Sequence, residues 1–178
     1  MQVPEEFRRL RASYEAYLLL ERGLSPNTRD AYLRDADRLC NCLADVGTTV
    51  PDADAGQLQQ FVAELHDLGI APRSQARIIS GMKSLYRFLH LEGIIDIDPT
   101  LKIDTPRIGR HLPDVLSVED INAMVEAVDL ERPEGPRNRA IIETLYGCGL
   151  RVSELCNLEI VRVDFDDGIL AVTGKGSK

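Results

Sequence analysis

Apolar residues recur at helical spacing along the first half of the chain and predict a bundle of amphipathic helices. The first expected helix ends at Gly23, Ser25-Pro26 has the composition of a helix start, and Gly93 ends the last helix. We expect four helices, over residues 5–22, 25–46, 54–68 and 73–91. Their apolar stripes should form the core, with Leu20, Tyr32 and Tyr86 among the inward positions.

The pattern changes after the fourth helix. Residues 99–113 hold three prolines and little helical period, which is typical of a linker between domains. Short helices are expected over 117–128, 136–146 and 151–158, and then two strands, 160–165 and 169–173, around a tight turn. We predict a mainly α protein: a four-helix domain (1–98), a linker (99–113) and a partial α+β domain (114–178). Because a lone hairpin is marginal, its last strand is expected to need a further partner.

The chain is acidic overall, but one segment of it is basic. A net charge of −8 argues against nucleic acid, yet residues 71–91 contain four basic residues and no acid. Steps of four, three, four and three residues place Arg73, Arg77, Ser80, Ser84 and Arg87 on one helical face. Such a face is either an ordinary solvated surface or a site for the phosphates of DNA. The residues that we expect to contact DNA are Thr28, Arg29, Arg34, Arg73, Ser74, Arg77, Ser80, Lys83, Ser84 and Arg87.

The sequence indicates no metal, disulfide or membrane chemistry. Three histidines are scattered, and four cysteines form no C-x-x-C pair, which favours reduced thiols packed as small apolar groups. No apolar run approaches the roughly 18 residues of a membrane span. The N-terminus is charged and has no secretory core. We expect a cytoplasmic protein.

Two further motifs carry candidate chemistry. Arg151 stands among apolar residues and glycines in LYGCGLRVSELCNLE, so a charge is expected close to a core. Either it is a structural arginine held by Glu154, or it is aimed at an anion such as phosphate. Gly174-Lys175-Gly176 is a turn signal and, taken alone, indicates little more than an exposed lysine. It lacks the spacing of a P-loop.

Together these motifs resemble the tyrosine recombinases, especially the Xer type. The resemblance rests on YGCGLRVSEL (146–155) and TGKG (173–176), and extends to LSPNTRDAYLRD (24–35), SQARIISGMKSLYRFL (74–89) and the linker at 106–113. It implies a SAM-like four-helix domain on one side of duplex DNA and a catalytic domain on the other. The second and fourth helices would face the DNA.

The resemblance also implies catalytic roles. Arg151 would bind the scissile phosphate and stabilise its transition state, and Glu154 would seat that arginine. Lys175 would protonate the departing 5′ oxygen, and a tyrosine would form a 3′-phosphotyrosyl link without metal or cofactor. The full-length partner would be double-stranded DNA, bound by a tetramer on two sites, to which a second recombinase can contribute.

The chain departs from the family pattern at the nucleophile. All five tyrosines (Tyr14, Tyr17, Tyr32, Tyr86 and Tyr146) precede Arg151, and none fits that role. We therefore expect a truncated, inactive recombinase that binds DNA and whose C-terminal end is poorly ordered from about Thr173. The alternatives are a stand-alone DNA-binding module or inhibitor, and a remnant whose acidic half serves a protein partner. Chromosome-dimer resolution, phage integration and transposon movement all remain open.

Overall fold

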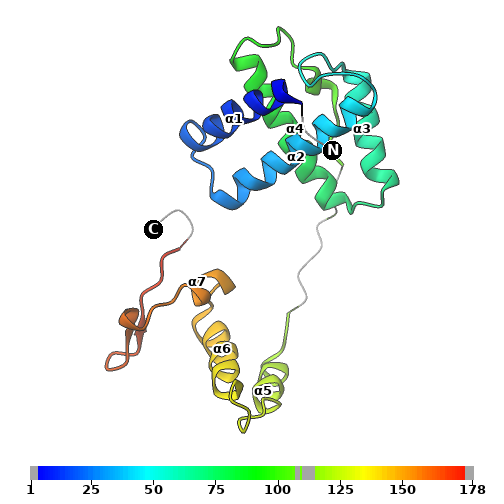
Figure 1. Cartoon of the computed structure of the whole chain (residues 1–178). Coiled ribbons are helices and arrows are strands. Elements are labelled where there is room, and N and C mark those ends of the chain that lie inside the picture. The colour runs from blue at the N-terminus through cyan, green and yellow to red at the C-terminus, as the bar shows by residue number, and fades with distance from the viewer. Residues whose placement is uncertain (1–3, 107–108, 110–114, 175–178) are drawn as a thin grey trace. The chain divides into compact units, whose positions relative to one another are not determined.

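The chain forms two compact units in a computed structural model, which describes residues 4–106, 109 and 115–174 (Figure 1). The first unit is Met1–Arg110 and the second is His111–Lys178. The predicted poor order from Thr173 falls largely outside the described residues. Each unit is treated by itself below.

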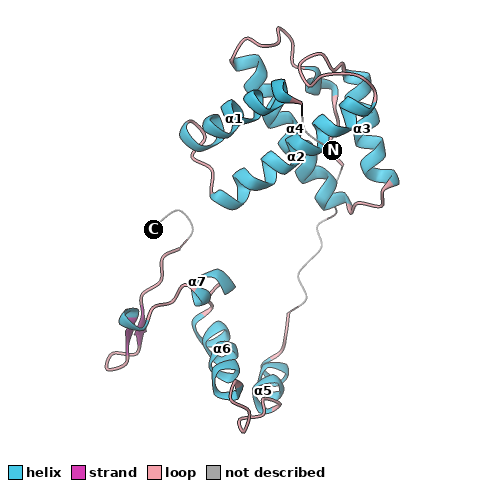
Figure 2. Cartoon of the chain, viewed as in Figure 1, coloured by secondary structure: helices cyan, strands magenta, loops and turns pink. Residues whose placement is uncertain are grey.

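The first unit is the four-helix domain that the sequence predicts, and the prediction is confirmed (Figure 2). Its elements are α1 (Glu5–Leu20), α2 (Pro26–Asp45), α3 (Ala55–Asp67), α4 (Pro72–Leu91) and a 3-10 helix, η1 (Pro99–Lys102). Local chemistry sets the starts of α2 and α3. The Ser25 hydroxyl accepts the Thr28 backbone N–H ahead of Pro26. Asp54 and Gln57 form a reciprocal capping box at the start of α3.

Helix α4 is the centre of this unit. Ten of its 20 residues are buried, and it packs against α1, α2, α3 and η1. Tyr14, Tyr17 and Phe88 form an aromatic cluster, in which the rings of Tyr14 and Tyr17 lie 5.4 and 5.2 Å from Phe88. Two expected core positions differ: Tyr32 is only half-buried, and Leu20 is 78% exposed. Leu20 follows the buried Leu18 by two positions, so it points to the other side of α1.

The first unit continues beyond α4. Helix η1 packs against both α3 and α4, and Thr100 and Ile103 are buried. Lys83 Nζ on α4 donates a hydrogen bond to the Ile103 carbonyl at 2.6 Å. The segment that we predicted as a linker, 99–113, therefore begins with residues packed on the first unit. Its proline content predicted a helix break, but it did not indicate the burial of Ile103.

The second unit contains helices followed by a small hairpin. Its elements are α5 (Val118–Glu126), α6 (Gly135–Cys148), α7 (Val152–Cys156), a 3-10 helix η2 (Ile160–Arg162), β1 (Val163–Asp164) and β2 (Ile169–Leu170). The strands pair antiparallel, with Val163 opposite Leu170. They are shorter than predicted because Ile160–Arg162 turns as a 3-10 helix. The Asp164 carboxylate accepts the backbone N–H groups of Asp166 and Asp167, and Gly168 has a φ of 67°.

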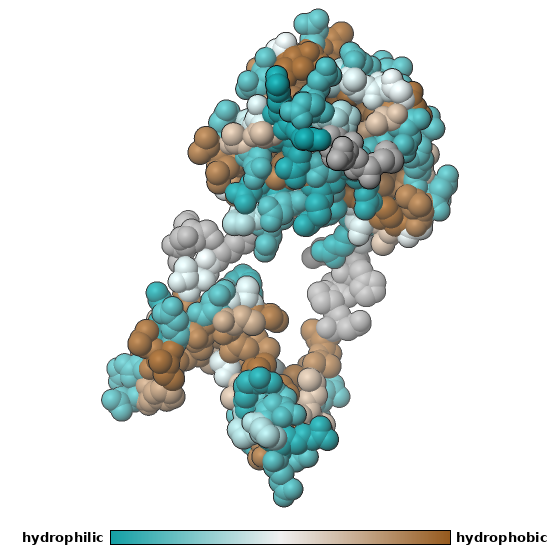
Figure 3. All heavy atoms as spheres, viewed as in Figure 1, coloured by the Kyte–Doolittle hydropathy of each residue, from teal (hydrophilic) through white to brown (hydrophobic). Residues whose placement is uncertain are grey.

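The second unit has little core of its own. Gly135 is the single buried residue among its described residues. Figure 3 shows hydrophobic side chains at the surface of this unit. The most exposed of them, each above 70%, are Val115, Ile160, Val161 and Phe165. The helices and hairpin of this unit therefore leave apolar side chains exposed at its surface. Across both units, the structure describes no helix long and apolar enough to cross a membrane.

Candidate nucleic-acid interface

The basic face of α4 is exposed, and the opposite face of the helix is buried. Arg73, Ser74, Arg77, Ser80 and Arg87 are exposed, and Lys83 and Ser84 are half-buried. The intervening apolar positions are buried, and Ile79, Met82 and Leu85 are at most 1% exposed. The helical spacing of this face is thus confirmed, while its contact with DNA stays a prediction.

Arg77 forms an ion pair across the α2–α4 interface. Its two terminal nitrogens, NH1 and NH2, donate to the Oδ2 and Oδ1 oxygens of Asp35 at 2.6 and 2.8 Å. The Arg77 side chain is 47% exposed, whereas that of Asp35 is 4% exposed. Burial of Asp35 raises the pKa of its carboxyl group, and the hydrogen bonds and charge of Arg77 oppose that rise.

Sequence reasoning missed Asp35. It follows Tyr32 by three residues and precedes Leu39 by four, so helical spacing alone places it on the apolar stripe of α2. Gly81 makes room for it: a Cβ at this glycine would lie 2.5 Å from Asp35 Oδ2. The spacing therefore held a usable signal, namely an acid on the apolar stripe of a helix.

Three other predicted contacts on α4 already have hydrogen-bond partners. Lys83 donates to the Ile103 carbonyl, and the Ser80 hydroxyl donates to the Ala76 carbonyl at 2.8 Å. Ser84 hydrogen-bonds the Tyr14 hydroxyl, which limits a rise in the pKa of Tyr14 caused mainly by burial. Lysine and hydroxyl groups can hold a second partner, so these bonds restrict the side chains without excluding a phosphate.

On α2 the predicted residues differ in how accessible they are. Arg34 is exposed. Arg29 is drawn toward carboxylates instead: its Nε lies 3.7 Å from Glu15 and 3.6 Å from Asp30, and its side chain is 23% exposed. The Thr28 hydroxyl lies 2.9 Å from the Ser25 hydroxyl at the start of the helix. Arg34 is therefore the most available of the three.

Arg73 and Arg87 are the cations of the α4 face for which the structure shows neither an ion pair nor a side-chain hydrogen bond with another described residue, whereas Arg77 binds Asp35 and Lys83 binds the Ile103 carbonyl. Arg87 lines an open cleft of about 650 Å³, whose other charged or titratable lining residues include Arg22, His90, Asp96 and Asp98. These two arginines are the simplest probes of the face, because replacing them breaks no buried interaction seen in the structure.

In the second unit, Arg151 and Glu154 form the predicted pair. Glu154 accepts the Arg151 backbone N–H at 2.8 Å and its NH1 at 2.6 Å. Both bonds lower the pKa of Glu154, the backbone bond more strongly. The Arg151 side chain is 69% exposed, so the expectation of a charge close to a core is wrong for the described residues, where this unit buries almost nothing. Lys175 lies outside the described residues.

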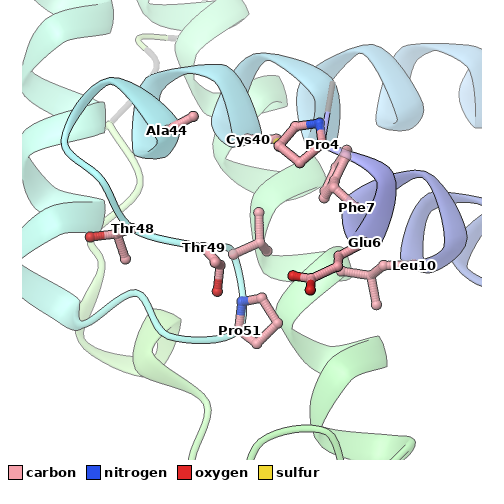
Figure 4. Close-up of a pocket in the computed structure, with 10 residues that line it drawn as sticks. Pro4, Glu6, Phe7, Leu10, Cys40, Ala44, Thr48, Thr49 and Pro51 are labelled. Carbon is pink, nitrogen blue, oxygen red and sulfur yellow. The ribbon is translucent and has the colours of Figure 1, made fainter. Parts of the chain in front are cut away.

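Other features do not add to this interface. Among the residues that the structure describes, no group of three or more His, Cys, Asp or Glu side chains could hold a metal ion. A mainly apolar pocket of about 220 Å³ lies between α1, α2 and the loop at 48–51, with Phe7, Leu10 and Cys40 on its wall (Figure 4). Glu6 is the one charged residue that lines it.

Comparison with known proteins accounts for both units. Residues 12–93 match the phage integrase N-terminal SAM-like domain, and residues 114–178 match the phage integrase family. The tyrosine recombinase XerD of Pseudomonas putida is 43% identical over 161 residues, which are 90% of this chain and 54% of that protein. XerD of Chlorobaculum tepidum is 37% identical over 177 residues, or 98% of this chain and 58% of that protein.

A solved structure supports the fold. The integrase of mycobacterium phage Brujita aligns with a TM-score of 0.53 at 20% identity, over 95% of this chain and 55% of that one. The chain spans little more than half the length of the curated relatives that it matches. It belongs to the phage integrase family as a XerD-like tyrosine recombinase, with the SAM-like N-terminal domain and part of the catalytic domain.

Proposed function

We propose that the first unit binds one side of duplex DNA through α4 and the start of α2, within a protein that performs site-specific recombination. The observation that carries the proposal is the acid-free basic face of α4, on which Arg73 and Arg87 are exposed. Exposed guanidinium groups on a face without acids suit contacts with the phosphate oxygens of DNA. Membership in the XerD-like family supports the same reading.

The second unit contributes phosphate chemistry in this proposal. Arg151 binds the non-bridging oxygens of the scissile phosphate and stabilises the charge that develops on them. Glu154 holds the arginine by its backbone N–H and its guanidinium, which leaves the other guanidinium N–H groups for the phosphate. Lys175 protonates the departing 5′ oxygen as general acid. A tyrosine nucleophile completes the reaction as a 3′-phosphotyrosyl intermediate, and a tetramer on two DNA sites exchanges the strands.

The DNA-binding part is tested by single substitutions on the α4 face. We expect Arg73→Ala and Arg87→Ala each to weaken binding to a duplex, and to reduce the slope of log K against log salt by about 1. Arg9→Ala on α1 removes the same charge from an exposed position that is not on this face, and should leave the slope unchanged. Fluorescence anisotropy at several salt concentrations measures all four proteins. If the salt slope is unchanged in both α4 variants, this face does not bind DNA and the proposal is wrong on that point.

The chemical part makes a separate prediction for the 178-residue chain. Its five tyrosines all precede Arg151, and Tyr14 and Tyr86 are fully buried. We therefore expect no nicked strand and no covalent protein–DNA adduct when the chain is incubated with a labelled duplex and analysed on a denaturing gel. Under this outcome the chain alone acts as a non-catalytic DNA-binding module, the second candidate function. An adduct would show that one of these tyrosines is a nucleophile after all.

A further inference from the structure

A buried carboxylate of α2 lies against helix α4 beneath its basic face. Asp35 is 3% exposed and is the one buried charged residue among those that the structure describes. Removing a carboxylate from water is costly unless it is paired and hydrogen-bonded, and both of its oxygens are held by Arg77. A negative charge at this place also repels the phosphates that the face would bind. From charge alone, Asp35 would therefore be expected to weaken DNA binding.

The geometry of the pair fixes the Arg77 head. A guanidinium carries five N–H groups, and Asp35 takes one from each terminal nitrogen. The Nε–H and two outer N–H groups are left over, on a side chain that is 47% exposed. A planar fork held at both tips cannot rotate freely, so less entropy is lost when the remaining donors bind a phosphate.

The same pair fixes the spacing of the two helices. Helix α4 passes so close to Asp35 that a Cβ at Gly81 would lie 3.0 Å from the Asp35 Cβ and closer still to its carboxylate. Asp35 therefore meets α4 at two positions that are one turn apart. Its carboxylate oxygens bind Arg77, and its side chain packs against the helix at Gly81. Both helices of the proposed interface are tied together at this carboxylate.

We propose that Asp35 is a positioning residue for DNA binding: it holds the Arg77 fork, and with it α2 and α4, in the arrangement that meets the duplex. The inference rests on the proposed function of the first unit. It predicts that removing a negative charge from the protein weakens its binding to a polyanion, which is the opposite of the electrostatic expectation.

The test compares Asp35→Asn with Asp37→Asn. Both remove one negative charge from α2, and both free an arginine, since Asp37 binds Arg11 Nε at 2.7 Å. Affinity for a duplex is measured against salt, below the unfolding temperature of each variant. We expect Asp35→Asn to weaken binding about tenfold, as for one lost charge-assisted hydrogen bond, and to reduce the salt slope by about 1. Asp37→Asn should bind as tightly as the unaltered chain or slightly tighter.

A second variant keeps the net charge constant. Arg77→Lys retains the positive charge, but a lysine cannot hold both carboxylate oxygens as a guanidinium fork does. If Asp35 positions Arg77, this variant should bind DNA more weakly. If only the charge matters, its affinity for DNA should not change. This variant decides the question if Asp35→Asn does not fold. If the unaltered chain binds DNA but neither variant binds more weakly than Asp37→Asn, the inference is overturned and the proposed function stands. If the unaltered chain shows no salt-dependent binding, the proposed function itself fails, and the inference with it.

Discussion

Replacing Gly81 with alanine should lower the free energy of unfolding of the first unit by about 3 kcal/mol, although alanine is the better helix former. The new Cβ would lie 2.5 Å from Asp35 Oδ2 and 3.1 Å from Asp35 Cγ. Because Arg77 holds both oxygens of that carboxylate, Asp35 cannot move aside without breaking a buried ion pair. Steric overlap and loss of the pair therefore act together.

Urea denaturation followed by far-UV circular dichroism measures this effect, since the chain contains no tryptophan. Ser80→Ala is the matched control, because it places alanine next to Gly81 on the exposed side of the same helix. It should change stability by no more than about 0.5 kcal/mol. A Gly81→Ala protein that unfolds at the same urea concentration as the control would contradict the close approach of α2 and α4.

Replacing Arg77 with alanine should cost about 3 kcal/mol of stability at pH 7, because it leaves the Asp35 carboxylate buried without its partner. Arg73→Ala removes the same charge one turn earlier on α4, where no ion pair with another described residue is lost. That control should stay within about 0.5 kcal/mol of the unaltered chain. An equal loss in both variants would show that the pair contributes little.

The loss should also depend on pH. Burial raises the pKa of Asp35 above the ordinary 3.8, and removing Arg77 takes away the interactions that oppose this rise. The folded variant then binds a proton more tightly than its unfolded chain, so its stability increases as the pH falls through the raised pKa toward 3.8. We expect the difference in the free energy of unfolding between Arg77→Ala and the unaltered chain to become smaller as the pH is lowered from 7 to 4. A gap that is constant over this range would mean that Asp35 does not carry the effect.

These effects alter how DNA-binding data on Arg77 are interpreted. Because Arg77→Ala changes the stability of the unit as well as the face, weaker binding by this variant would not by itself identify a phosphate contact. Arg73 and Arg87 form no ion pair with another described residue, so their substitution reports on the surface alone. The two kinds of residue look identical in the sequence, where both are arginines at helical spacing on one face.

Periodicity predicted the helices of the first unit well because each has a strong local signal. Ser25-Pro26 and Asp54 mark helix starts, and the apolar stripe of α4 is buried as expected. What the sequence did not reveal depends on contacts between distant residues. Asp35 and Arg77 are 42 positions apart, and no local rule states which side chain of α2 lies opposite which side chain of α4.

The second unit shows the opposite limit. Its motifs identified the family and the Arg151–Glu154 pair, since both are local in sequence. The expected burial of Arg151 was wrong because burial depends on the surface that surrounds a motif. Val152 is 67% exposed beside it, so the described residues do not enclose this site. Sequence spacing can predict that an arginine lies next to its carboxylate, but it does not predict whether other residues bury the pair.

The hydrogen bond from Lys83 to the Ile103 carbonyl determines where this module can be exchanged between proteins. A fusion joined after Asp98, the boundary that the prolines indicate, would discard the buried Thr100 and Ile103 and uncover parts of α3 and α4. A fusion joined after Asp104 would keep them. The joint for building chimaeric proteins from this chain therefore lies at Asp104, thirteen residues beyond the end of α4 and directly after Ile103, whose carbonyl is bonded to that helix.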